Sequence, residues 1–310
     1  MGNILITGGK GMVGSQFVGE EFTKPSHKDL DLINYDSLEK YLENNKKFDA
    51  IIHLAAKVGG VKANTDFIGD FAAVNMQINQ NILTLAARHS IPKVISLLST
   101  CVYPDEAHVN YPLTEDQLHM GPPHQSNFGY AYAKRMLDVQ SRAYRKQYGC
   151  NFITAIPNNL YGEFDNYESE NSHVIPAITR KIWEAKIRNS SYVEIWGDGS
   201  PLREFTYSGD ISQILLFLLE EYNEEHPINI GNTYEISIKD VVDIIKEELG
   251  YFGDIVWNTS KPSGQFRKPS SNKKLVSLGW DSRRYTSFQA GIQKVCKWFM
   301  ENYPNLRGIK

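Results

Sequence analysis

A glycine-rich turn close to the start of the chain sets the strongest constraint on its fold. Residues 8–14 have the sequence Gly-Gly-Lys-Gly-Met-Val-Gly and directly follow the apolar run Ile4-Leu5-Ile6. Glycines at this spacing let the backbone turn tightly, approach a phosphate and pack against the strand behind it. Glycines also serve ordinary turns, but this position, ahead of a long α/β pattern, favours a pyrophosphate cradle. The expected phosphate-binding residues are Gly8, Gly9, Lys10, Gly11, Met12, Val13 and Gly14, at the start of a helix over residues 14–22.

Strand-like and helix-like segments alternate through the first half of the chain. Apolar runs at residues 4–7, 50–55, 94–98 and 152–156 are separated by helix-like segments at residues 14–22, 35–44, 75–89 and 130–148. This alternation predicts right-handed βαβ crossovers and an α/β fold with a doubly wound parallel sheet of the Rossmann type. We expect a dinucleotide-binding domain over residues 1–162 and a smaller α/β substrate lobe over residues 163–310, from which some segments return to the main sheet.

The second half of the sequence has its own helix and strand signals. Helices are expected near residues 175–186, 214–221 and 238–249, and strands near Val193 and Ile228 are candidates to rejoin the main sheet. The stretch from 105 to 128 contains several prolines and is expected to be a surface loop without regular structure.

Composition excludes several classes of partner. The chain has 310 residues, 41% of them apolar, and a formal net charge of −3, so nothing indicates nucleic-acid binding. Three cysteines without close spacing argue against a disulfide framework or a zinc site, and we expect no metal and a reducing, cytoplasmic environment. No apolar stretch approaches the length of a membrane span, so no membrane partner is expected.

A tyrosine and a lysine lie four residues apart in a segment rich in helix formers. Tyr130 and Lys134 therefore share one helix face, and Gly149 supplies a helix-ending residue. A nearby ammonium favours the phenolate, so we expect Lys134 to lower the pKa of Tyr130 towards neutrality. Such pairs also occur by chance in many helices. Ser99 falls near the end of an apolar strand, where open α/β sheets place their ligands. It could hydrogen-bond a substrate carbonyl beside Tyr130.

With these residues the chain resembles the extended branch of the short-chain dehydrogenase/reductase superfamily, which modifies nucleotide sugars. Further motifs narrow the resemblance to the GDP-L-fucose synthase family, the epimerase-reductases that act on GDP-4-keto-6-deoxy-D-mannose. These motifs lie at residues 55–60, 99–104, 171–176, 196–205 and 264–268, so the similarity spans essentially the whole chain.

The resemblance implies a catalytic set of Ser99, Cys101, Tyr130, Lys134 and His173. A ketone at C4 acidifies the protons at C3 and C5, and by resemblance Cys101 removes a proton while His173 returns one on the opposite face. Tyr130 then supplies the proton for reduction at C4, Ser99 orients the carbonyl and Lys134 holds the nicotinamide ribose. Without the resemblance, Cys101 would be interpreted as a small buried apolar residue, and His173 as a loop or helix-cap histidine.

The implied cofactor is NADP(H), with the hydride coming from NADPH. Lys10, His27 and Lys28 could place cations near the adenosine ribose, where the second strand is expected to end, but Asp29 and Asp31 lie close by and leave the preference over NADH ambiguous. The remaining implied cofactor-binding residues are Leu97, Leu98, Lys134, Pro157, Asn158, Asn159, Leu160 and His173.

By resemblance the substrate is a GDP-sugar. Lys181, Trp196, Arg203 and Lys268 match family positions that contact the GDP group, although any of these cations could instead be a solvated surface charge. The resemblance also implies a homodimer that pairs the helices at residues 75–89 and 130–148.

Several alternatives stay open at the level of sequence. The sugar could be a 6-deoxyhexose or a related keto-heptose, and one or both carbons could be epimerised. An NAD-retaining epimerase or dehydratase would use the same scaffold, although dehydratases of this branch usually carry Asp-Glu where Cys101 and Val102 stand. A noncatalytic dinucleotide sensor would typically lack the Tyr130 and Lys134 pair.

Overall fold

The main sheet of the protein is built from six parallel strands. The computed structural model describes residues 2–169, 172–260 and 266–309. The strand order is β2-β1-β3-β4-β5-β9, with bounds β1 (Ile4–Thr7), β2 (Phe22–Thr23), β3 (Ala50–His53), β4 (Lys93–Leu97), β5 (Asn151–Pro157) and β9 (Ile228–Ile230). The expected α/β parallel sheet is confirmed. The order reverses between β1 and β3, and such a switch point places ligands at the carboxyl ends of these strands.

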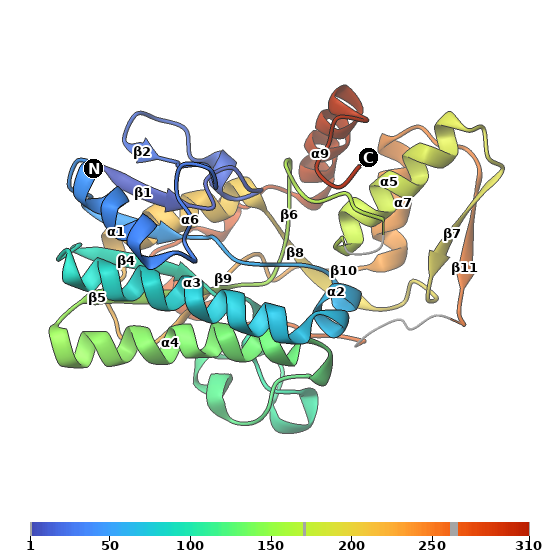
Figure 1. Ribbon diagram of the computed structural model, residues 1–310. Helices are drawn as coiled ribbons and strands as arrows, with labels where there is room; N and C mark the ends of the chain where they lie inside the picture. Colours follow the sequence, from blue (N-terminus) through green and yellow to red (C-terminus); the bar gives the residue numbers. More distant parts are fainter. Residues whose placement is uncertain (1, 170–171, 261–265, 310) are drawn as a thin grey trace.

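Helices cover both faces of this sheet, because its strands are apolar on both sides. The helices α1 (Tyr35–Asn44), α3 (Ile68–Arg88) and α4 (Phe128–Tyr148) pack with Leu5 in one core cluster. Ile4 and Ile6 point the other way and pack with α6 (Ser208–Glu221) in a second cluster. Figure 1 shows α3 and α4 lying side by side over the first face. The sheet is therefore doubly wound, and its two helical layers fix the ends of β1, β3 and β4.

The remaining elements form smaller layers. β10 (Glu235–Ser237), β8 (Leu202–Tyr207) and β6 (Asn159–Tyr161) make a three-stranded sheet, and β11 (Asp254–Asn258) pairs with β7 (Tyr192–Trp196). Helices α5 (Val174–Ile187), α7 (Ile238–Glu248) and α9 (Phe288–Asn302) pack with them in a third core cluster. The short helices are α2 (Val61–Asp66) and α8 (Lys273–Ser277). These layers lie beside the main sheet (Figure 1). The division after residue 162 stays a prediction.

Several expected elements are confirmed and others are wrong. Helix α4 ends at Tyr148, and Gly149 caps it with a φ of +69°, as its position predicted. The prediction of a helix over residues 14–22 is wrong. Only a 3₁₀ turn, Gly14–Gln16, forms, because the backbone is extended at Phe17 and Gly19 has a φ of +150°. Helix α3 also begins earlier than expected, at Ile68.

The second strand is shorter than the sequence suggested. β2 ends at Thr23, ahead of Pro25, which has no N–H to donate to a neighbouring strand. His27 and Lys28 therefore lie in a turn beyond the strand, and the expectation that they end it is wrong. β7, the strand near Val193, pairs with β11 instead of the main sheet. The stretch from 105 to 128 forms three 3₁₀ turns, and its Leu113 and Leu118 are buried in the first core cluster, so the expectation of a surface loop without regular structure is wrong.

Within the part of the chain that the structure describes, no helix combines the length and apolar character that crossing a membrane requires.

Candidate active site

The glycine-rich turn forms a closed loop of backbone at the end of β1. Gly11 N donates to Gly8 O at 2.9 Å, and Ser15 N donates to Gly11 O at 2.8 Å. A side chain at Gly14 would come within 2.4 Å of Gly8 O, so only glycine fits there. Gly8 itself has a φ of +69° and packs against the backbone of Ala55, just beyond β3. This cradle fits a pyrophosphate, which no side chain would block, but the helix dipole expected to assist it is missing because the 3₁₀ turn is so short.

The basic residues expected near the adenosine ribose gather around a second turn. Ser26 N and Oγ donate to the Asp29 carboxylate at 2.9 and 2.5 Å. These hydrogen bonds lower the pKa of Asp29, and the charge of Lys10 contributes in the same direction. Lys10 therefore faces the turn that carries His27 and Lys28, both of which are exposed. Asp29 stays a neighbour of these cations.

Ser99 and Cys101 lie at the carboxyl end of β4. Ser99 caps the 3₁₀ turn Thr100–Val102, and its Oγ accepts a hydrogen bond from Cys101 N at 3.4 Å. Leu97 ends the strand, and Leu98 N donates to Ala155 O at 2.8 Å, which holds the two backbones together. Cys101 is a half-buried free cysteine. Its thiol is thus held at the sheet edge where this fold places ligands.

Helix α4 brings Tyr130 and Lys134 to the same place. Lys134 is only 2% exposed, and its Nζ donates to Leu97 O at 2.7 Å and lies 5.9 Å from the centre of the Tyr130 ring. Burial lowers the pKa of Lys134 to about 8. Burial, with a smaller contribution from Cys101, raises the pKa of Tyr130 well above its ordinary value. The expected lowering of the Tyr130 pKa by Lys134 is therefore wrong here, because desolvation of the phenolate dominates.

A buried polar chain that the sequence analysis missed supports this pair. Thr7 Oγ1 and His53 Nδ1 lie 2.8 Å apart, and His53 Nε2 lies 3.1 Å from Asn79 Oδ1. Asn79 Nδ2 donates to Ala133 O in α4 at 3.2 Å. Burial and the charge of Lys134 lower the pKa of His53 to about 3, so its ring is neutral. The sequence shows Thr7 and His53 as polar residues at the ends of two otherwise apolar strands, but it does not show the hydrogen bonds that they make.

His173 stands apart from these residues. It precedes α5 as its N-cap, and its Nδ1 lies 4.0 Å from Asp165 Oδ1. The structure gives it no hydrogen bond or ion pair with the described Ser99, Cys101 or Tyr130. Asn171, which begins the motif that carries His173, lies outside the described residues.

The four expected GDP-binding residues form two pairs. Lys181 Nζ lies 5.2 Å from the centre of the Trp196 ring. Arg203 Nη1 donates to Leu202 O at 2.7 Å, and Lys268 lies within electrostatic reach of both Arg203 and Cys101. Burial lowers the pKa of Lys268. The second pair thus lies close to the Cys101 thiol. Residues 264 and 265 of the motif around Lys268 lie outside the described residues.

Residues 157–160, the segment expected beside the nicotinamide, are held against β8 by hydrogen bonds. The Asn158 side chain is buried, donating to Asn232 O at 2.7 Å and accepting from Thr206 Oγ1 at 2.7 Å. Asn159 Nδ2 donates to Glu204 O at 2.9 Å. Pro157 ends β5, and Leu160 packs against the second core cluster. The polar side chains here bond to protein, and their role as cofactor-binding residues stays a prediction.

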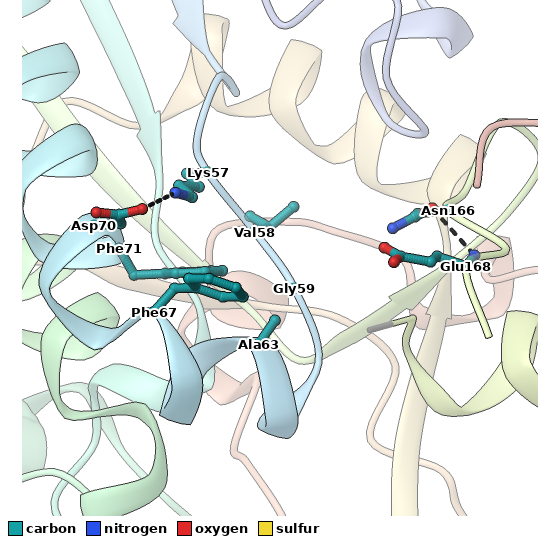
Figure 2. A pocket seen from close by; sticks show the side chains of 9 residues that line it. All are labelled: Lys57, Val58, Gly59, Ala63, Phe67, Asp70, Phe71, Asn166 and Glu168. Carbon is teal, nitrogen blue, oxygen red and sulfur yellow. Dashed lines mark hydrogen bonds and ion pairs between the residues drawn. The ribbon is translucent and has the colours of Figure 1, made fainter. Parts of the chain in front are cut away.

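A cavity of about 260 Å³ lies between the start of α3 and the segment that carries Asn166 and Glu168 (Figure 2). Lys57 and Asp70 form an ion pair of 2.9 Å on its wall, and Phe71 packs edge-on against Tyr130 with ring centres 6.5 Å apart. Asn166 and Glu168 line the opposite side (Figure 2). The other lining residues are Val58, Gly59, Ala63 and Phe67. A cavity with aromatic walls and a few polar groups suits a sugar-sized ligand.

Comparison with known proteins agrees with this arrangement. The model of the NAD dependent epimerase/dehydratase family matches residues 4–231. The GDP-L-fucose synthase of Dictyostelium discoideum is 40% identical over 317 residues, which cover 98% of this chain and 97% of that protein. That of Sinorhizobium fredii (strain NBRC 101917 / NGR234) is 42% identical over 305 residues, covering 96% of each. A crystal structure of a GDP-L-fucose synthetase from Naegleria fowleri bound to NADP has a TM-score of 0.91 at 38% identity, covering 99% of this chain and 95% of that one.

Proposed function

The chain belongs to the NAD-dependent epimerase/dehydratase family, and from this premise we propose that it converts GDP-4-keto-6-deoxy-D-mannose to GDP-L-fucose by 3,5-epimerisation and NADPH-dependent 4-keto reduction. This is the activity for which the Dictyostelium and Sinorhizobium relatives are named. The observation that carries the proposal is the convergence of Cys101, Tyr130 and Lys134 at the carboxyl end of β4. These groups supply a thiol, a phenol and an ammonium around one point, as proton transfer next to a ketone requires.

The first step is epimerisation next to the ketone. Cys101 removes a proton from C3 or C5, leaving an enolate on the sugar, and His173 delivers a proton to the other face. The Ser99 hydroxyl donates to the C4 oxygen and stabilises the charge that develops on it. Because the ketone acidifies both neighbouring carbons, the same pair of groups serves both positions.

The second step is reduction of the ketone. NADPH supplies the hydride when it is bound. Tyr130 donates its hydroxyl proton to the C4 oxygen, and its raised pKa keeps the phenol protonated, as a proton donor requires at neutral pH. Lys134 is fixed to Leu97 O with its ammonium near the Tyr130 ring, and it would hold the nicotinamide ribose of a bound cofactor.

The cofactor and the substrate are assigned to opposite ends of the site. We assign the pyrophosphate of the cofactor to the glycine cradle and its adenosine end to Lys10, His27 and Lys28, a set of cations that suits a 2′-phosphate. For the GDP group of the substrate, Lys181, Arg203 and Lys268 offset the diphosphate charge, and Trp196 supplies an aromatic surface. Lys268 interacts electrostatically with Cys101, which supports a binding mode with the sugar end of the nucleotide next to that thiol.

We also propose a homodimer joined through α3 and α4, and a reducing, cytoplasmic environment. The two helices expose Met76, Met136 and Val139 on their outer surface. The three cysteines of the chain are all free.

The decisive experiment supplies GDP-4-keto-6-deoxymannose and NADPH in D₂O. We expect GDP-L-fucose with deuterium at C3 and C5 and one NADPH oxidised for each product. NADPH oxidation without deuterium would reduce the activity to that of a simple ketoreductase, and Cys101→Ser would then have little effect. Turnover without net NADPH oxidation would indicate an NAD-retaining epimerase or dehydratase. A 4-keto-heptose analogue, run in parallel, tests the choice of sugar.

A further inference from the structure

We propose that Asp165 is the positioning residue for His173, holding the imidazole with Nδ1 towards the protein and Nε2 towards the sugar. The inference rests on the proposed role of His173 as the proton donor in epimerisation. Asp165 lies between β6 and α5, eight residues before the histidine.

The Asp165 carboxylate is fixed inside the protein and has bonding capacity left. The residue is 7% exposed, and its Oδ1 accepts a hydrogen bond from Asn166 N at 2.7 Å. Its Oδ2 is buried and accepts no hydrogen bond from any described residue. Burying a carboxylate oxygen without a hydrogen-bond donor costs folding free energy. We therefore expect this carboxylate to have a functional partner. The neighbouring acid-base group is His173, with its Nδ1 4.0 Å from Oδ1.

The placement of His173 requires such a partner. The residue caps the N-terminus of α5, where the helix dipole disfavours a positive charge. An anion beside the ring offsets this effect and stabilises the imidazolium, which is the form that donates a proton. The histidine side chain is 48% exposed, so its other edge faces outward and can reach a ligand. Catalytic hydrogen bonds are often long without substrate and tighten in the complex, which accommodates the 4.0 Å separation.

The charges around Asp165 agree with this pairing. Burial raises the pKa of Asp165, and the positive charges of His173 and Arg307 and the Asn166 amide oppose that rise. Tyr167 also faces the carboxylate, and its hydroxyl is buried and unpartnered among the described residues. His173 is the largest of the contributions that oppose the rise, so the two side chains interact across this separation.

The test is Asp165→Asn, assayed by deuterium incorporation at C3 and C5. We expect a loss of about 10–100-fold, a part of the 10²–10⁴-fold that general acid-base transfer contributes. Asp165→Asn removes the negative charge that stabilises the protonated imidazole ring, so the alkaline limb of the exchange profile should move to lower pH. Asp165→Glu keeps the charge and should restore the position of that limb, whereas Tyr167→Phe should leave both rate and profile unchanged.

A double-mutant comparison separates positioning from a structural role. In a His173→Asn background, Asp165→Asn should cost nothing further, because it acts through the histidine. The far-UV circular dichroism spectrum should stay unchanged in each variant and shows that the protein is folded. An unshifted profile in Asp165→Asn, or an equal further loss in the His173→Asn background, would overturn the inference. Wild-type protein that incorporates no deuterium would instead refute the proposed epimerisation itself.

Discussion

At the residue scale, the state of Tyr130 depends on burial more than on its lysine neighbour. Lys134 Nζ donates to Leu97 O, so its ammonium is held at the end of β4. Burial raises the pKa of the phenol and lowers that of the ammonium to about 8. Desolvation disfavours the charged form of each group. Tyr130 therefore enters the reaction as a protonated phenol.

Tyr130→Phe should remove the reductase step while sparing epimerisation. We expect NADPH oxidation to fall by about 10²–10⁴-fold, since general acid catalysis at C4 is lost, with deuterium still entering C3 and C5. Stopped-flow absorbance of NADPH and mass spectrometry of the recovered sugar measure the two steps. Tyr132→Phe is the matched control, because Tyr132 lies on the same helix and packs against Phe128. Equal loss of both steps in Tyr130→Phe would contradict the division of roles.

At the element scale, one buried carboxylate ties the Lys268 segment to β8. Glu204 accepts hydrogen bonds from Ser270 N at 3.0 Å and Ser270 Oγ at 2.6 Å. The same segment is joined to the loop over residues 105–128, because Leu113 N donates to Pro269 O at 2.8 Å. Burial raises the pKa of Glu204 to about 7. This anchor sets where Lys268 stands relative to Cys101.

Glu204→Gln should therefore raise the KM for the GDP-sugar several-fold and leave the NADPH dissociation constant unchanged. The amide keeps the shape but loses the charge-assisted hydrogen bonds that hold Ser270. Initial rates at varied substrate, with cofactor binding followed separately, measure the effect. Glu235→Gln is the control, since Glu235 lies in β10 and pairs with the exposed Arg267 next to Lys268, and surface ion pairs contribute little. The idea fails if both variants change KM equally.

Local signals in the sequence predicted some elements well and others not at all. Helix α4 was predictable because helix formers run up to Gly149, which then adopts the left-handed conformation. The helix expected after Gly14 does not form. Its absence could not be predicted, because it depends on the backbone conformation at Phe17 and Gly19. The hydrogen bonds of His53 join residues far apart in sequence, and no local pattern reports them. The roles of Cys101 and His173 came from resemblance, and they stay proposals.

At the scale of the whole molecule, the candidate site lies where the main sheet meets the smaller layers. The glycine cradle, Ser99 and Tyr130 come from the main sheet and its helices, whereas His173, Lys181 and Arg203 come from elements that follow β6. β9 and α6 nevertheless belong to the main sheet and its covering layer, although both follow residue 162. The chain therefore crosses between the two parts more than once, which couples the cofactor end of the site to the substrate end.

The outer surface of α3 and α4 carries the last prediction, the homodimer. Met136 and Val139 on α4 and Met76 on α3 are exposed, and Gln140 Nε2 donates to Gln80 Oε1 between the helices at 2.9 Å. Pairing two copies across a two-fold axis would bury these apolar side chains in a four-helix bundle.

Light scattering should give twice the chain mass for the wild type. Met136→Glu should shift the protein to monomer, because the axis would bring the new charges together. Val256→Glu, at an exposed position on β11, is the control and should leave the mass unchanged. A monomeric wild type would contradict the prediction.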